Sequence, residues 1–385
     1  MAREKHRITT RSQTEYLPCD ILFSILSRLP LKSVLRFCCV SKYWFDVITD
    51  PDFRRLHFLQ SATDPTVLIL LHRKSMENII SMNLLNVKEH GVHVGTNAIS
   101  HMVISGSCKL VGTCNGLLCF TSSNQGESIF VCNPITRELV TLPKPTRTAP
   151  PESSMLIYGF GFDYLTKKYK VVRVFYPTNS RFRNPRFGVT AEVCTLGATW
   201  KAVRGFNHPP YSRPVFANGA VHWLVHPLLS QKYKRIISFD IGKDEFNVTP
   251  HPKFSSNISI SELGGCLSVV PDIEYDLVKV WVLKDHTENR WEKEHMFSIY
   301  RPYPSTRFPR LISICECNGV LLVWLQDGFY SYDCKTKCQN TLKISGFPTW
   351  LDWEVCSGYR GSLVPLGAYH DNKDGEKDDA YFVAA

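Results

Sequence analysis

Between positions 17 and 59, apolar residues recur at intervals of three and four, which is the spacing of one face of a helix. The first predicted helix stops at Pro30, because proline cannot continue the helical hydrogen-bond ladder. A second short helix is predicted over 31–37. A third begins near Ser41, a residue type that caps helix N-termini, and a fourth opens at Pro51 behind a capping aspartate. The amino-terminal segment is therefore predicted to form four short helices.

These four helices can bury only a small core, yet the segment is rich in Leu, Ile, Phe and Trp. One interpretation is a helical cap that packs on the rest of the chain. The other, which we favour, is a helical module whose surplus apolar surface is covered by a second protein.

The same residues resemble an F-box over about 15–60, behind a flexible N-terminus at 1–14. The resemblance is carried by Leu17-Pro18-x-Asp20-Ile21-Leu22-x-x-Ile25-Leu26-x-x-Leu29-Pro30 and by Lys32-Ser33-x-x-Arg36-Phe37-x-Cys39-Val40-Ser41-Lys42-x-Trp44. It implies docking on the SKP-type linker subunit of a cullin–RING ubiquitin ligase. The apolar residues that would form the docking face and its core are Leu17, Pro18, Ile21, Leu22, Ile25, Leu26, Leu29, Pro30, Leu31, Val34, Leu35, Val40 and Trp44.

Beyond position 65 the helical spacing gives way to short runs of β-branched and aromatic residues separated by turn residues, which predicts strands. Asn-Gly or Gly-Gly pairs, which accept the positive φ angles of a tight hairpin, precede four of these runs, at 115–116, 218–219, 264–265 and 318–319. A second turn type begins with Asp or Asn, whose side chains bond nearby backbone amides, at 133–136, 163–168, 240–243 and 333–336.

With Gly161 as the counterpart in the second unit, the hairpin signals recur about every 51 residues between Gly116 and Gly319. A period near fifty with four short strands per unit predicts a kelch-like β-propeller. Five units of four strands can be followed from about 107 to 344.

Three strand-like fragments remain outside the five units, near 66–72, 78–85 and 362–366. A ring closes best when its first and last strands share a blade, so these fragments are expected to form a sixth. The predicted fold is thus mainly β, with a small α-helical F-box followed by a six-bladed propeller over 66–367 and a charged tail over 368–385.

The strand-rich part is similar to the F-box-associated domain of plants, often described as kelch-like. The motifs that carry this similarity are Cys114-Asn115-Gly116-Leu117-Leu118-Cys119, Cys132-Asn133-Pro134-Ile135-Thr136, Tyr158-Gly159-Phe160-Gly161-Phe162-Asp163 with Tyr169-Lys170-Val171-Val172, and Asn218-Gly219-x-x-His222-Trp223. The whole chain resembles a plant F-box adaptor, a group that includes S-locus and defence-regulating members. The resemblance implies a non-catalytic substrate receptor that presents a target protein for ubiquitination.

Antiparallel strands reverse direction, so successive connections alternate between the two ends of each blade. Counting along the chain places the tight turns at one end, the tight-turn end. The long connections, 143–155, 176–187, 204–212, 250–257 and 300–309, fall at the other, the loop end.

Two of these long connections combine arginine with aromatic residues, the types that dominate binding hot spots. The predicted target-binding residues are Arg181, Phe182, Arg183, Arg186, Phe187, Arg301, Tyr303, Arg307 and Phe308. The alternatives are a solvated insertion and a surface that stacks on single-stranded RNA. Because the chain carries no RNA-binding motif, nucleic acid is not the expected partner.

Composition restricts the expected partners and the expected cellular compartment of the protein. The 385 residues carry a net charge of +10, which favours acidic partners without requiring nucleic acid. The first sixteen residues lack the apolar core of a signal peptide, and no apolar stretch is long enough to span a membrane. We therefore expect a cytoplasmic or nuclear protein whose 14 cysteines are mostly small buried hydrophobes.

Motifs for phosphate loops, dinucleotide loops, nucleophile elbows and zinc proteases are absent from the sequence, so no cofactor or metal is expected. His222 and His226 are four residues apart, but on a strand they only share a face. Two alternatives to the adaptor stay open: a propeller enzyme acting on carbohydrate, and an interaction scaffold that works without a cullin.

Overall fold

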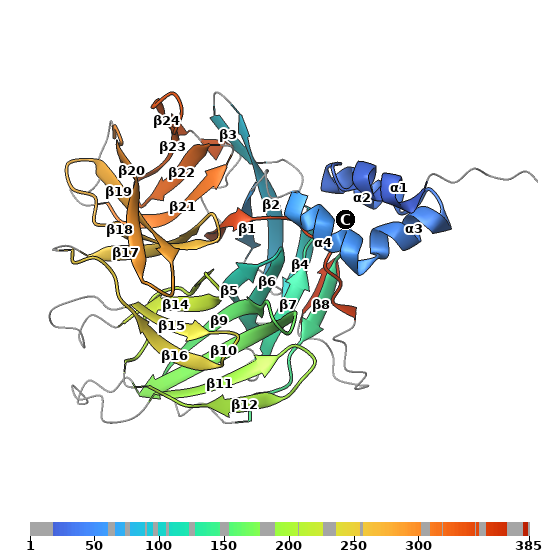
Figure 1. Ribbon diagram of the computed structural model, residues 1–385, viewed down its shortest axis with the longest axis horizontal. Coiled ribbons are helices and arrows are strands. Elements are labelled where there is room, and N and C mark those ends of the chain that lie inside the picture. The colour runs from blue at the N-terminus through green and yellow to red at the C-terminus, as the bar shows by residue number, and fades with distance from the viewer. Residues whose placement is uncertain are drawn as a thin grey trace, which may run out of the picture. The chain divides into compact units, whose positions relative to one another are not determined.

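The structure is a computed structural model that separates into two compact units, Met1–Ser61 and Ala62–Ala385. Figure 1 shows the first unit as the dark blue helices and the second as strands coloured from lighter blue to red. The residues described are 18–60, 66–73, 78–88, 91–94, 99–104, 108–122, 128–146, 154–177, 189–206, 208–225, 236–254, 257–301, 309–317, 319–342, 344–345, 352–367 and 380–383.

The four predicted helices are confirmed as α1 (Cys19–Leu26), α2 (Leu31–Phe37), α3 (Lys42–Thr49) and α4 (Pro51–Gln60). Their starts follow from the sequence. The Ser41 hydroxyl accepts a hydrogen bond from the Trp44 amide at 3.2 Å, and the Asp50 carboxylate accepts one from the Phe53 amide at 3.1 Å. These side chains satisfy amides that have no partner within the helix.

The core of the helical unit is small and contains residues of all four helices, among them Leu26, Val34, Ile48 and Phe53. The Phe53 ring packs edge-on against Phe23 with centroids 5.3 Å apart. This core uses one side of each helix and leaves other apolar side chains exposed.

In the second unit the described strands form six sheets, of which five are antiparallel meanders of four consecutive strands. The five blades are β5 (Cys108–Cys114) to β8 (Glu138–Thr141), β9 (Ser154–Asp163) to β12 (Trp200–Val203), β13 (Val215–Ala217) to β16 (Glu245–Thr249), β17 (Ile258–Leu263) to β20 (Arg290–Ser298), and β21 (Leu311–Cys317) to β24 (Gln339–Leu342). The middle strands are β6 (Leu117–Ser122), β7 (Ser128–Asn133), β10 (Lys168–Pro177), β11 (Thr190–Thr195), β14 (Ala220–Leu224), β15 (Ile236–Asp240), β18 (Cys266–Pro271), β19 (Leu277–Asp285), β22 (Val320–Leu325) and β23 (Gly328–Asp333). The five predicted units of four strands are therefore confirmed.

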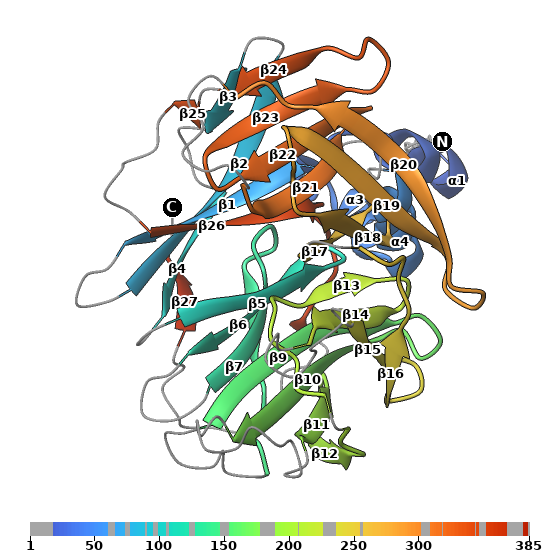
Figure 2. The same cartoon turned by 90° about the vertical axis from the view of Figure 1, so that its left-hand side faces the viewer.

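The sixth sheet has seven strands and draws them from both ends of the strand-rich part. Its strands are β1 (Thr66–Arg73), β2 (Asn78–Lys88), β3 (Gly91–Val94), β4 (Ser100–Ile104), β25 (Ile344–Ser345), β26 (Asp352–Tyr359) and β27 (Ala380–Val383). Figure 2 shows β26, in red, alongside β1, in blue, with which it pairs in antiparallel register.

The innermost strands form a closed ring. Strands β5, β9, β13, β17, β21 and β26 contact one another in that order, and β26 returns to contact β5. The unit is therefore a β-propeller with five regular blades and a larger closing sheet.

Three sequence predictions about the propeller are wrong. The closing strand is β26, whereas 362–366 is irregular. The boundary at 367 is too early, because β27 pairs with β4 from within the expected tail. Gly161 lies inside β9 and not in a turn; it is needed because a Cβ there would stand 2.6 Å from the Phe216 ring of the next blade.

Every regular blade carries the same Asp- or Asn-initiated turn. In each, the first side chain accepts hydrogen bonds from the amides two and three residues on, and the fifth residue has positive φ. The turns begin at Asn133, Asp163, Asp240, Asp285 and Asp333. The sequence analysis predicted all of these turns except the one at Asp285.

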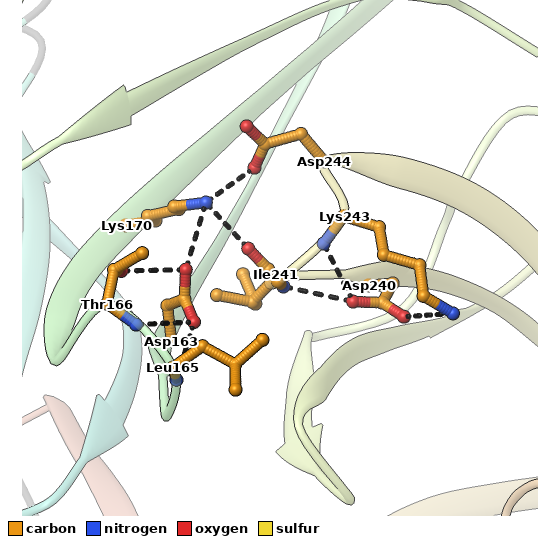
Figure 3. Close-up of polar contacts among 9 residues, drawn as sticks. Asp163, Leu165, Thr166, Lys170, Asp240, Ile241, Lys243 and Asp244 are labelled. Atoms are coloured by element: carbon orange, nitrogen blue, oxygen red, sulfur yellow. Dashed lines mark hydrogen bonds and ion pairs between the residues drawn. The ribbon is translucent and has the colours of Figure 1, made fainter.

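Two of these turns tie neighbouring blades together at the tight-turn end, as Figure 3 shows. The Lys170 ammonium of β10 donates hydrogen bonds to the Ile241 carbonyl oxygen at 2.7 Å and to an Asp244 carboxylate oxygen at 2.8 Å. It also lies 3.5 Å from an Asp163 carboxylate oxygen. Lys170 is buried, so the positive charge of its ammonium group is balanced by carboxylates inside the protein.

The chain after β26 covers the first blade at the same end. The Asn133 side-chain amide donates to the carbonyl oxygens of Ser362 and Val364 at 3.0 and 2.9 Å, and Glu138 accepts from the Leu366 amide at 2.9 Å. Gly116, at φ +79°, lies so close beneath this segment that a Cβ would overlap the Arg360 carbonyl oxygen.

We expect Gly116→Ala to lower the free energy of unfolding by about 2–4 kcal/mol, since it combines positive-φ strain with overlap against packed backbone. Gly219 is the matched control: it has φ +75°, and nothing lies within 4 Å of the place that a Cβ would take. Gly219→Ala should cost only the strain, about 1 kcal/mol. Urea unfolding of both variants measures the difference, and equal losses would contradict the packing of 360–366 on Gly116.

Candidate functional site: two docking surfaces

The helical unit sorts the predicted docking residues by exposure. Ile21 and Ile25 are each 47% exposed, whereas Leu22 and Leu26 are buried. Among the others, Pro18, Pro30 and Val40 are exposed; Leu29, Leu31, Leu35 and Trp44 are partly buried; and Val34 is buried. Leu17 lies outside the described residues.

This division follows from the helical period. Ile21 and Ile25 are one turn apart on α1 and share a face, and Leu22 and Leu26 share the neighbouring face. The leucine face fills the core of the unit, so the isoleucine face is left open. One stripe of α1 therefore holds the unit together, and the other is accessible from outside.

Two further apolar side chains are exposed on the helical unit, Phe45 at 49% and Leu59 at 58%. Neither was predicted as a docking residue. The signal that could have indicated Phe45 is its position in α3: Val47 and Ile48 take the buried positions of that helix.

On the propeller, the strand order confirms the separation of the two ends. Within each blade the connections between first and second strands and between third and fourth lie at the tight-turn end, and these are short. The connections β8–β9, β10–β11, β12–β13, β16–β17 and β20–β21 all fall at the loop end. The loop end carries the longer connections, which vary in length from blade to blade, so it is the better candidate for binding.

Of the nine predicted target-binding residues, eight lie outside the described residues: Arg181, Phe182, Arg183, Arg186, Phe187, Tyr303, Arg307 and Phe308. The ninth, Arg301, is buried, so its predicted contact with a target is wrong. Its guanidinium pairs with Asp276 and Asp327, each at 2.6 Å. Composition alone could not show that two carboxylates distant in sequence would take up this charge.

His222 has a structural environment. It is fully buried, and its Nε2 lies 3.1 Å from the Ala217 carbonyl oxygen, while its Nδ1 has no partner among the described residues. No group of three or more His, Cys, Asp or Glu side chains suited to a metal ion occurs in the described ranges. His226 falls outside them.

Burial lowers the pKa of His222 to about 3 from the usual 6.5. Below pH 6.5 the imidazole of His222 therefore binds a proton in the unfolded chain but stays neutral in the folded protein. The free energy of unfolding decreases as pH falls from 6.5 toward 3. Between pH 7 and pH 5 we expect this residue to lower the free energy of unfolding by about 2 kcal/mol. Urea unfolding at both pH values measures it. His222→Gln should remove that part of the pH dependence; an unchanged slope would contradict the assignment.

No helix among the described residues has the length and apolarity to cross a bilayer. This holds for all four helices of the first unit, which are 7 to 10 residues long.

Comparison with known proteins agrees with this architecture. Residues 55–319 match the model of the F-box associated beta propeller domain, and residues 15–56 match the F-box domain. The chain belongs to the F-box associated beta propeller family. Its F-box followed by a propeller is the architecture of a substrate adaptor of SCF ubiquitin ligases in general.

Several Arabidopsis thaliana proteins are similar along most of their length. The F-box protein At3g07870 is 27% identical over 89% of this chain and 91% of its own, and the F-box protein CPR1 is 26% identical over 88% and 87%. The F-box/kelch-repeat protein At3g23880 is 28% identical over 83% of this chain and 88% of its own.

Proposed function

We propose that this protein is the non-catalytic substrate receptor of an SCF ubiquitin ligase in the cytoplasm or nucleus. The exposed isoleucine face of α1 docks on the SKP-type linker subunit, which brings cullin and RING subunits. The loop end of the propeller holds a target protein for ubiquitination. The observation that carries the first part is the 47% exposure of both Ile21 and Ile25, next to the buried Leu22 and Leu26.

Physical chemistry supports a receptor that performs no reaction itself. Holding target and ligase in one complex converts a bimolecular encounter into a local one, which raises the effective concentration of the target lysines. Specificity then depends on the propeller surface, and bond formation takes place on the other subunits.

The test is binding of the purified full chain to an SKP-type linker subunit, followed by recovery of cullin from cells that express the tagged chain. We expect a stable complex with the linker and co-purification of cullin. Linker binding without cullin would instead indicate a cullin-independent scaffold, and failure to bind the linker would refute the docking proposal.

A further inference from the structure

Two tyrosines at the loop end of the fourth blade are exposed to solvent. Tyr275 is 87% exposed and Tyr300 is 73% exposed, the highest values for aromatic side chains among the described residues. Neither hydroxyl has a hydrogen-bond partner among those residues. Their exposure contributes nothing to the core, so folding alone does not account for them.

The backbone segments that carry the two tyrosines meet at the end of the β19–β20 ladder. Leu277 of β19 pairs with Ser298 of β20, and the ladder continues with the Ile299 amide donating to the Asp276 carbonyl oxygen at 2.8 Å. Tyr275 and Tyr300 are the next residues on the two chains, so both project from the same end of one hairpin.

The backbone beneath both tyrosines is fixed. The Gln339 side chain accepts from the Tyr300 amide at 2.6 Å and donates to its carbonyl oxygen at 3.1 Å. Arg301, which follows, is locked to Asp276 and to Asp327. A partner that binds these rings would therefore lose little free energy to the ordering of the backbone that carries them.

Tyr275 also occupies a backbone conformation that glycine would fill better. It lies at φ +52° and Asp276 at φ +60°, in a tight turn closed by the Leu277 amide donating to the Glu274 carbonyl oxygen at 3.0 Å. Seven other non-glycine residues of the described chain have positive φ; all seven lie at the tight-turn end, and none is aromatic. An exposed aromatic ring kept in a strained position indicates a role in binding.

The two short segments that carry the tyrosines are acidic, although the chain as a whole carries +10. Residues 272–276 and 299–301 contain three carboxylates, Asp272, Glu274 and Asp276, against the single guanidinium of Arg301. Glu274 is exposed, and the Asp276 side chain is 40% exposed. Aromatic faces beside carboxylates attract lysine and arginine side chains through cation–π and ionic contact.

We propose that Tyr275 and Tyr300, with Glu274 and Asp276, form a binding surface for a basic, lysine- or arginine-bearing segment of a partner protein. The identification of that partner as the ubiquitination target rests on the proposed function.

To test this, random 12-residue peptides displayed on phage are selected for binding to the immobilised full chain. We expect enrichment of peptides that contain Lys or Arg, and at least about tenfold weaker binding of the selected peptide, made synthetically, to Tyr275→Gly and to Tyr300→Ala. Tyr275→Gly should leave the unfolding midpoint unchanged or raise it. Leu165→Ala is the matched control, because Leu165 is also 87% exposed but lies at the tight-turn end, and it should bind as the wild type does.

Enrichment of acidic or purely apolar peptides, no enrichment, or unchanged affinity in both tyrosine variants would overturn the proposal. A lower unfolding midpoint in Tyr275→Gly would show a structural role and also overturn it. Linker binding is measured on the same preparations. Peptide binding without linker binding would refute the proposed function and leave this surface in place.

Discussion

Replacing Ile21 and Ile25 together by aspartate is expected to weaken binding to an SKP-type linker subunit by about a hundredfold or more. The two side chains form the open stripe of α1, and a partner that covers them would have to bury two unpaired carboxylates in their place. Surface plasmon resonance with the purified linker subunit measures the change.

The fold of the helical unit should survive this change, because exposed positions contribute little to its core. Ser24→Asp is the matched control: it places a carboxylate on an exposed position of the same helix without removing an apolar side chain. Retained affinity in the isoleucine variant would move the docking surface away from α1, and Phe45 and Leu59 would be the next residues to replace.

Replacing Arg173 by methionine is expected to lower the free energy of unfolding of the propeller by about 3–5 kcal/mol. Arg173 of β10 and Glu192 of β11 are directly opposite in register, 3.0 Å apart, and their side chains are 1% and 0% exposed. Without the guanidinium, Glu192 stays buried, and the Thr146 hydroxyl that donates to it at 2.7 Å is neutral and cannot balance its charge. Urea unfolding measures the loss.

The double variant Arg173→Met, Glu192→Leu distinguishes two contributions to the free energy of unfolding. One is the cost of leaving the Glu192 carboxylate buried without its partner, and the other is the contribution of the ion pair itself. Removing both charges should recover most of the lost stability, because apolar residues of similar volume can replace a buried ion pair. A double variant as unstable as the single one would mean that the pair itself, and not the unpaired carboxylate, determines the effect.

Local chemistry made the helices and most blades predictable. The capping residues Ser41 and Asp50, and hairpin glycines such as Gly116 and Gly219, act within a few residues of themselves, so their effect can be recognised in the sequence. Gly161 is also a glycine, but it is not a turn residue. Glycine is needed there because the Phe216 ring of another blade leaves no room for a side chain.

Contacts between distant segments explain what could not be predicted. The strand that completes the ring is β26 because its backbone pairs with β1, and the run at 362–366 covers the first blade instead. Arg301 was predicted to bind a target because its neighbours were basic and aromatic, whereas its position is decided by Asp276 and Asp327. At α1, the period predicted the apolar face, and only packing distinguished Leu22 and Leu26 from Ile21 and Ile25.

The pairing of β1 with β26 has a consequence for biosynthesis. Roughly 290 residues separate Leu68 from its partner Cys356, so a growing chain must add all of them before that partner exists. Until then the first strand keeps one row of backbone amides and carbonyls unsatisfied, which is a template for mispairing with other nascent chains. Closure of the ring thus waits until β26 has been made, and the edge of β1 stays open until then.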